Sequence, residues 1–532
     1  MQAPFYPIIY VRGYAMTEGE RDETAADPFC GFNLGSTVYR ASIDRNAGPK
    51  KFIFESPLLR LSAEFGYGDV YENGLDIMDP DWRPRPVRQA EPPNKGIPAR
   101  SVIVYRYYDS GSSLLGDGKA RDIKDYVRGL SHLVLRVRDL VVAQEGIAQA
   151  DFRCYLVAHS MGGLVVRGML QNPTLSDPKA RSAVDKVFTY ATPHNGIQIA
   201  GVHVPSWLGL NDINNFSHER MADLLNLDGA RKKYGRVDFV PDSAFPIERI
   251  FCLVGTNRAD YGAAMGISRT FAGNGSDGLV KIENASVWGL DKNNNFTRTC
   301  ATAYAYRSHS GVFGIVNSEE AYQNLSRFLF GDVRVDLWIQ VDEVRLPEKL
   351  EKEAEVRALY QFELMACARG KRWFLSRRVA EEDSPACRSH EQLTTQQSTG
   401  GNMVYLSSVF LANGAKVSQA DRSLTYAMDL KIQVPDYEVN KRFWPDQHFE
   451  GSHLFRNSLA ISLTPPEKEG GKWQVMHSWE SDQLGQTSLE IQPEALAHGE
   501  IKISVDLPSG NAKPGLSGKV LLIVSAWNIA PR

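Results

Sequence analysis

The sequence predicts an α/β fold built on a mostly parallel sheet, followed by a C-terminal, sandwich-like all-β domain. Residues 1–330 alternate short apolar strands with amphipathic helices, as in a parallel sheet covered on both faces. Beyond residue 331, apolar residues recur with period two, as in half-buried strands. The length of 532 residues also exceeds the size at which single hydrophobic cores stop growing. Two domains are therefore expected.

The elements of the first domain follow one another in a regular order. Short apolar runs predict strands at residues 7–11, 101–105, 152–157, 184–190, 250–254 and 301–306. Steps of three and four residues predict a long helix from Ile123, Val127, Leu130, Val134, Val137 and Val141. A second helix follows residue 160, and a third is expected at 319–330 before Gly331. The first domain is accordingly placed at residues 1–331.

Two long connections interrupt this order, at residues 14–100 and 197–246. Connections of this length in a compact domain are usually lids or binding loops. The second is rich in apolar side chains near its start, including Trp207 and Leu208. We expect the two insertions to cover the approach to a site, with Trp207 and Leu208 as lid or pocket residues. The same side chains would equally suit the packed core of a lid.

The second domain is expected at residues 332–532. It opens with apolar residues that alternate with mainly polar neighbours, namely Val333, Val335, Leu337, Ile339 and Val341. Strand-like runs then recur at residues 403–410, 424–434, 459–463, 501–507 and 520–527. Short strands separated by turn-rich segments are typical of a β-sandwich. The sequence leaves open whether this domain contacts a membrane, a protein partner or the first domain.

Composition disfavours several classes of protein. The net charge of −3 argues against nucleic-acid binding, which needs a basic surface. No apolar run approaches the roughly 20 residues that span a bilayer. The N-terminus has neither the charged nor the apolar region of a signal peptide. We therefore expect either a chain made without a leader, cytoplasmic or exported by another route, or a mature secreted chain with an added Met.

Six cysteines occur at irregular spacings without a C-x-x-C pair, so no zinc site is expected. Cys154, Cys252 and Cys300 fall in or beside apolar strands and are interpreted as buried thiols. Cys367 and Cys387 are candidates for a disulfide, which their spacing leaves open. No cluster of oxygen ligands for a metal is evident, and we expect no cofactor.

The segment from Leu156 to Val166 carries the main functional motif. Strand formers lead into a turn at Ser160, and an apolar helix begins directly after it. A serine at such a turn exposes its oxygen at a helix N-terminus, where free N–H groups and the helix dipole favour negative charge. Ala158 and Gly162 are small, as close backbone packing at the turn requires. Ser160 is therefore predicted to be a nucleophile.

A nucleophilic serine needs a base and a group that orients the base. In a parallel sheet both come from loops at the carboxyl ends of strands, in the order serine, acid, histidine. Asp277 lies in a glycine-rich loop after the fifth expected strand, and His309 follows the sixth. We predict Asp277 as the acid and His309 as the base. Weaker candidates for the acid are Asp260, Glu283 and Asp291.

The negative oxygen of a tetrahedral intermediate needs backbone N–H donors. The amide of Met161, directly after the nucleophile, is one expected donor. We assign the other to the amide of Tyr14, because Gly13 lets the backbone bend after the first strand. His159 is expected to pack or to form a hydrogen bond locally. His194, at another strand end, is interpreted either as a pocket residue or as a tie between its loop and the backbone.

These motifs resemble those of α/β-hydrolases of the lipase group, in particular bacterial triacylglycerol lipases and GPI inositol-deacylase-like lipases. The resemblance rests on residues 158–163, 192–196 and 276–280, in the family's order, and does not extend past residue 331. It implies a triad of Ser160, Asp277 and His309, with Tyr14 and Met161 as oxyanion donors. The chain departs from the family after the first strand, where it has Arg-Gly and the family usually has His-Gly.

Together these features predict a serine carboxylic-ester hydrolase: a lipase or esterase, with phospholipase activity included, that works through an acyl-enzyme. The expected partners are a lipid or other apolar ester substrate and a lipid surface contacted peripherally. The same triad serves amidases, thioesterases and polyester hydrolases, because the fold does not determine which kind of bond is hydrolysed. A non-catalytic relic that binds lipid or protein is a third hypothesis.

Overall fold

The structure is a computed structural model of the whole chain. It describes residues 4–13, 37–40, 50–53, 56–70, 77–78, 82, 84, 94–105, 107, 121–197, 217–258, 275–309, 314–351, 356–369, 371, 373–416, 420–439, 447–466, 471–482, 489–508 and 510–528. Among the sequence-predicted site residues, Tyr14, Trp207 and Leu208 lie outside these ranges, as does the rival acid Asp260.

In the described ranges, the first sheet has seven strands. Their spatial order is β12 (Ala301–Ala305), β9 (Ile250–Gly255), β7 (Val184–Tyr190), β6 (Cys154–His159), β1 (Ile8–Val11), β5 (Ser101–Tyr105) and β4 (Gly68–Asp69). The six strands from β9 to β4 pair in parallel. The inner strands β1, β6 and β9 are buried at every residue, which explains their unbroken apolar sequences. A parallel sheet with helices in this order confirms the predicted α/β-hydrolase fold class.

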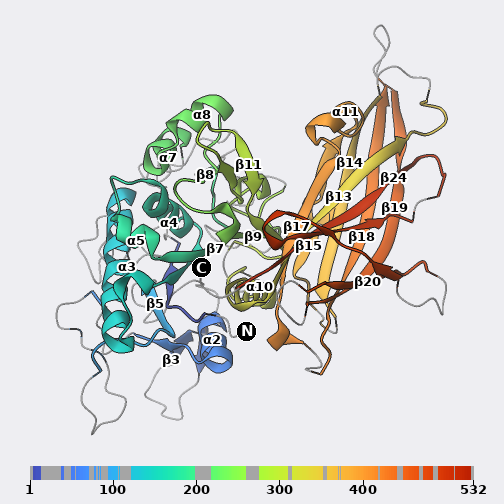
Figure 1. Cartoon of the computed structure of the whole chain (residues 1–532). Coiled ribbons are helices and arrows are strands. Elements are labelled where there is room, and N and C mark those ends of the chain that lie inside the picture. The colour runs from blue at the N-terminus through green and yellow to red at the C-terminus, as the bar shows by residue number, and fades with distance from the viewer. Residues whose placement is uncertain are drawn as a thin grey trace. The chain divides into compact units, whose positions relative to one another are not determined.

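Three helices gather beside the parallel strands: α3 (Ile123–Glu145), α4 (Gly162–Gln171) and α5 (Pro178–Ser182) (Figure 1). α3 begins after Asp122, whose side chain accepts a hydrogen bond from the Lys124 N–H, and ends at Gly146 with φ of 69°. Its buried face follows the spacing of the sequence pattern. Every residue of α4 is buried, so the helix that follows Ser160 is packed on all sides and holds that turn rigidly.

The two insertions contain more regular structure than the sequence indicates. In the first, β2 (Thr37–Arg40) and β3 (Lys50–Ile53) pair antiparallel, α2 (Ser56–Phe65) follows, and β4 joins the parallel sheet. In the second, α7 (His218–Leu225) buries one face in the main core, and α8 (Asp228–Tyr234) follows. Residues 217–246 therefore belong to the packed body of the α/β fold. Both helices were missed because seven or eight residues are too few for a clear helical period.

The C-terminal region forms two antiparallel sheets. One has the order β17 (Met403–Leu411), β13 (Val333–Arg345), β24 (Gly515–Ala526), β23 (Ile501–Asp506) and β22 (Glu494–Ala495). The other runs β15 (Ser376–Arg378), β14 (Val356–Ala368), β18 (Leu424–Val439), β19 (Gln447–Thr464), β20 (Gln474–Trp479) and β21 (Leu489–Ile491), with β16 (Ala386–Ser389) also on β14. One core cluster takes side chains from both sheets, as in a β-sandwich. The long strands are seen side by side in Figure 1.

The chain divides into two compact units. We call residues 5–302 and 307–325 the α/β-unit, and residues 1–4, 303–306 and 326–532 the β-unit. Helix α10 (Glu319–Phe330) contributes its first residues to the former and its last turn to the latter. Within the β-unit, Phe328 packs against Phe410 and Trp527, and the Trp527 indole N–H donates a hydrogen bond to the Phe328 carbonyl at 2.7 Å.

The disulfide considered from the sequence is wrong. Cys387 on β16 lies opposite Gln361 of β14, whereas Cys367 is six residues further along β14 and lies opposite Ala427. Six residues of strand span about 20 Å, far more than a disulfide can bridge. Neither thiol is in a disulfide, and the same holds for the buried thiols Cys154, Cys252 and Cys300. None of the helices in the described ranges is long and apolar enough to cross a membrane.

Candidate active site

Ser160 occupies a strained turn between β6 and α4. Its φ is +51°, a region that non-glycine residues seldom adopt. The turn requires small neighbours. A Cβ on Gly162 would lie 2.2 Å from the Val11 carbonyl oxygen, and one on Gly163 would lie 2.2 Å from the Thr192 hydroxyl. The expected close packing of backbone at this turn is therefore present, and it presents the Ser160 hydroxyl at the start of α4.

The structure brings together Ser160, His309 and Asp277 in one hydrogen-bonded row. His309 Nε2 lies 2.9 Å from Ser160 Oγ, and His309 Nδ1 lies 2.9 Å from Asp277 Oδ2. His309 and Asp277 are buried, with 3% and 1% of their surfaces exposed. An ionised carboxylate can only accept hydrogen bonds, so the proton of the His309 ring is on Nδ1. Nε2 therefore carries no proton and accepts a hydrogen bond from the serine hydroxyl. This is the geometry of a nucleophile, its base and the group that orients the base.

The carboxylate of Asp277 is fixed by its own loop. Its second oxygen, Oδ1, accepts hydrogen bonds from the N–H groups of Leu279 and Val280 at 3.0 and 2.7 Å. The His309 N–H donates to the Asp277 carbonyl at 3.0 Å, which ties the two loops together. Gly255, at the end of β9, leaves room for the loops of Asp277 and His309. A Cβ at this position would lie 2.7 Å from the Arg307 carbonyl oxygen and 2.8 Å from Asp277 Cβ. Sequence reasoning missed Gly255.

The rival acids occupy other surroundings. Asp291 lies in the turn between β10 (Trp288–Leu290) and β11 (Phe296–Thr299), where its carboxylate accepts from the Asn293 and Asn295 N–H groups. Glu283 lies in a short 3-10 helix after the Asp277 loop, and its carbonyl accepts from Arg236. Neither contacts His309, whereas Asp277 does.

Of the two expected oxyanion donors, Met161 lies among the residues that the structure describes. Met161 is the N-cap residue of α4, and its N–H donates to no carbonyl among the described residues. Gly13 packs directly on the nucleophile, since a Cβ on it would lie 2.9 Å from Ser160 Cβ. The close approach explains why glycine is required at residue 13. The Tyr14 amide itself lies outside the described residues.

His159 bonds to a residue far away in the sequence, whereas the sequence predicted only a local contact. Its Nε2–H donates to the carbonyl of His309 at 2.9 Å, and the two imidazole centroids are 5.0 Å apart. Burial lowers the pKa of His159 to about 3, so the ring is neutral at ordinary pH. His159 therefore holds the backbone of the histidine loop from the strand that carries Ser160. The partners are 150 residues apart, so no local pattern could reveal the bond.

Because His159 is buried and neutral, the loss of stability on substituting it should depend on pH. The unfolded chain protonates His159 below about pH 6.5, while the folded chain keeps it neutral to about pH 3, so acid selectively stabilises the unfolded wild type. His159 thus contributes stability that is present above pH 6.5 and lost on acidification. We expect the destabilisation by His159→Gln to shrink by about 2 kcal/mol from pH 7 to pH 5 in urea denaturation.

The exposed His132 of α3 offers a matched control for this measurement. His132→Gln should change the free energy of unfolding by less than about 0.5 kcal/mol at either pH, as surface substitutions usually do. A destabilisation by His159→Gln that is the same at pH 7 and pH 5 would contradict a buried neutral ring.

His194 is fully buried and belongs to a structural network. Its Nε2 lies 3.2 Å from the Thr189 hydroxyl and 3.5 Å from Cys252 Sγ. Arg167 of α4, also buried, donates to the carbonyls of His194 and of two residues near β8 (Phe239–Pro241). Burial lowers the pKa of His194 well below its usual value. These contacts favour the interpretation of His194 as a tie between α4, β7 and its own loop, since a fully buried ring has no surface to offer a substrate.

Within the described ranges, no three His, Cys, Asp or Glu side chains converge as a metal site would require.

The chain matches no protein-family model and no curated protein. Solved structures with similarity include a mature lipase from Bacillus licheniformis, 16% identical over 60% of this chain and 89% of that chain, with a TM-score of 0.28. Phospholipase PlaB from Legionella pneumophila is 12% identical over 84% of this chain and 89% of its own, with a TM-score of 0.29. A gene product of Listeria innocua is 10% identical over 61% and 94%, with a TM-score of 0.25. Similarity at this level does not establish an activity.

Proposed function

We propose that the protein is a serine carboxylic-ester hydrolase that acts on a lipid or another apolar ester through an acyl-enzyme. The observation that carries the proposal is the row of hydrogen bonds from Ser160 through His309 to Asp277, with 2.9 Å at each step. Further support comes from the strained serine turn and the N-terminus of α4 beside it, which favour negative charge where an oxyanion would form.

In the proposed reaction, Ser160 Oγ attacks the ester carbonyl carbon while its proton passes to His309 Nε2. The carbonyl oxygen becomes an oxyanion, which the N–H of Met161 and a second amide after Gly13, assigned to Tyr14, would stabilise. Collapse of the intermediate releases the alcohol, which takes the proton from His309. Water then attacks the acyl-enzyme, gives its proton to His309, and the acid leaves as the proton returns to Ser160. Asp277 stabilises the imidazolium in both steps.

The first test is labelling of the full chain with a fluorophosphonate probe, followed by a panel of p-nitrophenyl esters of increasing acyl length beside phospholipids, amides and thioesters. We expect stoichiometric labelling at Ser160 and the highest kcat/KM on an ester. Failure to label would contradict a reactive serine and favour a binding relic. Labelling with faster turnover of an amide or thioester would keep the nucleophile but overturn the ester assignment.

We also propose that the start of the second insertion acts as a lid. Replacing both Trp207 and Leu208 by serine should lower the rate on aggregated long-chain esters by about tenfold, because large apolar side chains would no longer meet the lipid. The rate on soluble short esters should change little. Trp288→Ser, at a residue that is 41% exposed on β10, is the matched control. Equal losses on both kinds of ester would contradict a lid.

The proposal also divides the chain into a catalytic and an accessory domain. We propose that residues 1–331 supply the chemistry and that residues 332–532 form an accessory domain, since every proposed catalytic residue precedes residue 310. Contact of the accessory domain with a lipid surface would be peripheral. No nucleic-acid partner and no cofactor form part of the proposal.

A further inference from the structure

A pocket of about 270 Å³ opens on the β-unit where several elements end. Its walls come from the last turn of α10, the ends of β14 and β17, and the start of β18. Three cationic side chains line it: Arg327, Arg369 and Lys416. They come from three separate segments, so only the folded β-unit brings their charges together. The pocket is distinct from the residues proposed for ester hydrolysis.

Arg327 is the buried cation of this set. Only 4% of its surface is exposed, and its guanidinium lies 5.1 Å from the centroid of the Trp373 ring. A buried guanidinium is poorly hydrated, so an anion that reaches it competes with little water. Arg369 and Lys416 are more open to solvent and lie at the rim. The pocket therefore combines a fixed inner charge with two outer ones.

One carboxylate, that of Asp421, also lines the pocket. It is held by the Ser423 N–H at 2.9 Å and the Ser423 hydroxyl at 2.8 Å. Lys416 donates to the Asp421 backbone carbonyl. Hydrogen bonds from Ser423 lower the pKa of Asp421, and the nearby charges of Arg369 and Lys416 lower it further. With three cations and one carboxylate, the lining keeps a formal charge of +2.

We propose that this pocket binds a phosphate group, either as free phosphate or as the phosphate of a phospholipid headgroup. Three cations from separate segments match the charge of a phosphate and its several oxygens, whereas one guanidinium is enough to pair with a carboxylate ligand. Ser423 and Thr425 also belong to the lining, and their hydroxyls donate to Asp421 and to Ser462 of β19. Asp421 limits the affinity, because its negative charge repels the ligand.

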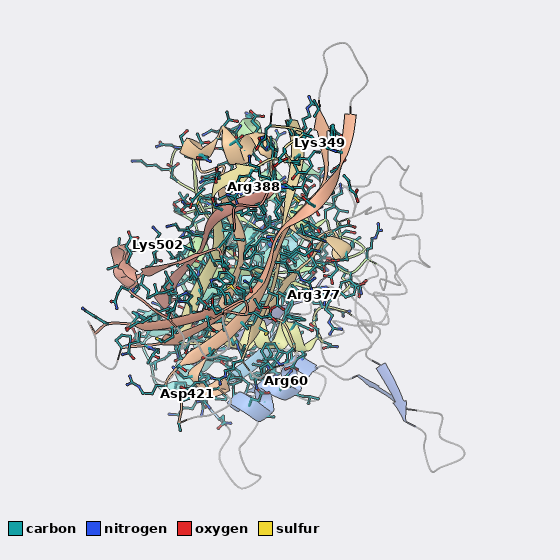
Figure 2. The ribbon with its side chains drawn as sticks, turned by 90° about the vertical axis from the view of Figure 1, so that its right-hand side faces the viewer. Arg60, Lys349, Arg377, Arg388, Asp421 and Lys502 are labelled. Carbon is teal, nitrogen blue, oxygen red and sulfur yellow. The ribbon has the colours of Figure 1, made fainter. Side chains whose placement is uncertain are left out.

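The test measures binding of inorganic phosphate to the full chain by calorimetry at constant ionic strength. We expect Arg369→Gln and Lys416→Gln each to weaken binding at least about tenfold, as loss of a charge-assisted hydrogen bond does. Asp421→Asn keeps the acceptor for Ser423 but removes the repulsion, so it should tighten binding. Lys502→Gln is the control, since Lys502 pairs with Glu494 on β22 outside the pocket lining. Asp421 and Lys502 are both labelled in Figure 2.

The source of the phosphate is resolved by vesicles of phosphatidylglycerol in phosphatidylcholine. The wild type should sediment with these vesicles if the ligand is a headgroup. Lys416→Gln and added inorganic phosphate should then each reduce sedimentation, whereas Lys502→Gln should not. Phosphate binding with no such effect on vesicles identifies a soluble phosphate. The proposal is overturned if wild type binds neither probe, or if Arg369→Gln, Lys416→Gln and Lys502→Gln behave alike. Circular dichroism establishes that each variant is folded, and neither outcome depends on ester hydrolysis.

Discussion

Replacing Ser160 by alanine should abolish ester hydrolysis, with a loss in kcat on the order of 10⁴- to 10⁶-fold. Only the attacking oxygen is removed. The Cβ that packs beside Gly13 is retained, so the turn and the fold should survive. Steady-state kinetics on a short soluble ester, with circular dichroism for the fold, would measure the effect.

Ser182→Ala is the matched control, because this serine lies on the surface helix α5 and bonds only locally to the Lys179 carbonyl. It should keep the wild-type rate. Wild-type turnover in the Ser160 variant would mean that another nucleophile is at work.

Asp277→Asn should lower kcat by about 10⁴-fold, because it would move the proton of the His309 ring from Nδ1 to Nε2. The side chain must still accept hydrogen bonds from the N–H groups of Leu279 and Val280, which places the new NH₂ toward His309. An NH₂ donates, so Nδ1 would become the acceptor and Nε2 would carry the proton. A protonated Nε2 cannot take the proton of Ser160.

His309→Ala should be at least as impaired, and the Asp277→Asn/His309→Ala double variant little worse than the single ones. Groups that act as a unit are strongly non-additive. Asp291→Asn, which alters a carboxylate that holds a surface turn, is the control and should leave kcat unchanged. Additive losses, or a nearly active Asp277→Asn, would place the orienting acid elsewhere.

The parts of this fold that are encoded locally could be predicted from the sequence. Buried strands such as β6 and β9 are continuous apolar runs, because both faces of a parallel strand are covered. Ser160, Asp277 and His309 each follow such a strand in a small or glycine-rich loop, so their order along the chain indicated a shared edge of the sheet. The structure brings these three together.

Features that depend on distant partners could not be predicted. The burial of Glu363 on β14 is one such feature: this residue alternates with the core residues Phe362 and Leu364 as a solvent-facing residue would, yet its carboxylate is buried and pairs with Lys431 of β18 at 3.0 Å. The bond from His159 to the His309 carbonyl joins two segments that no local period connects. The phosphate pocket likewise draws Arg327, Arg369 and Lys416 from separate segments.

The glycines around Ser160 affect how any mutational survey of this chain would be interpreted. Gly13, Gly162 and Gly255 have no reactive group, but a single methyl on any of them would lie within 3 Å of a neighbouring atom at the site. In an alanine scan scored by activity, these positions would be as intolerant as Ser160 itself. Sensitivity to substitution would therefore outline the space that the reacting groups need, and only covalent labelling of the serine would separate a misplaced nucleophile from a missing one.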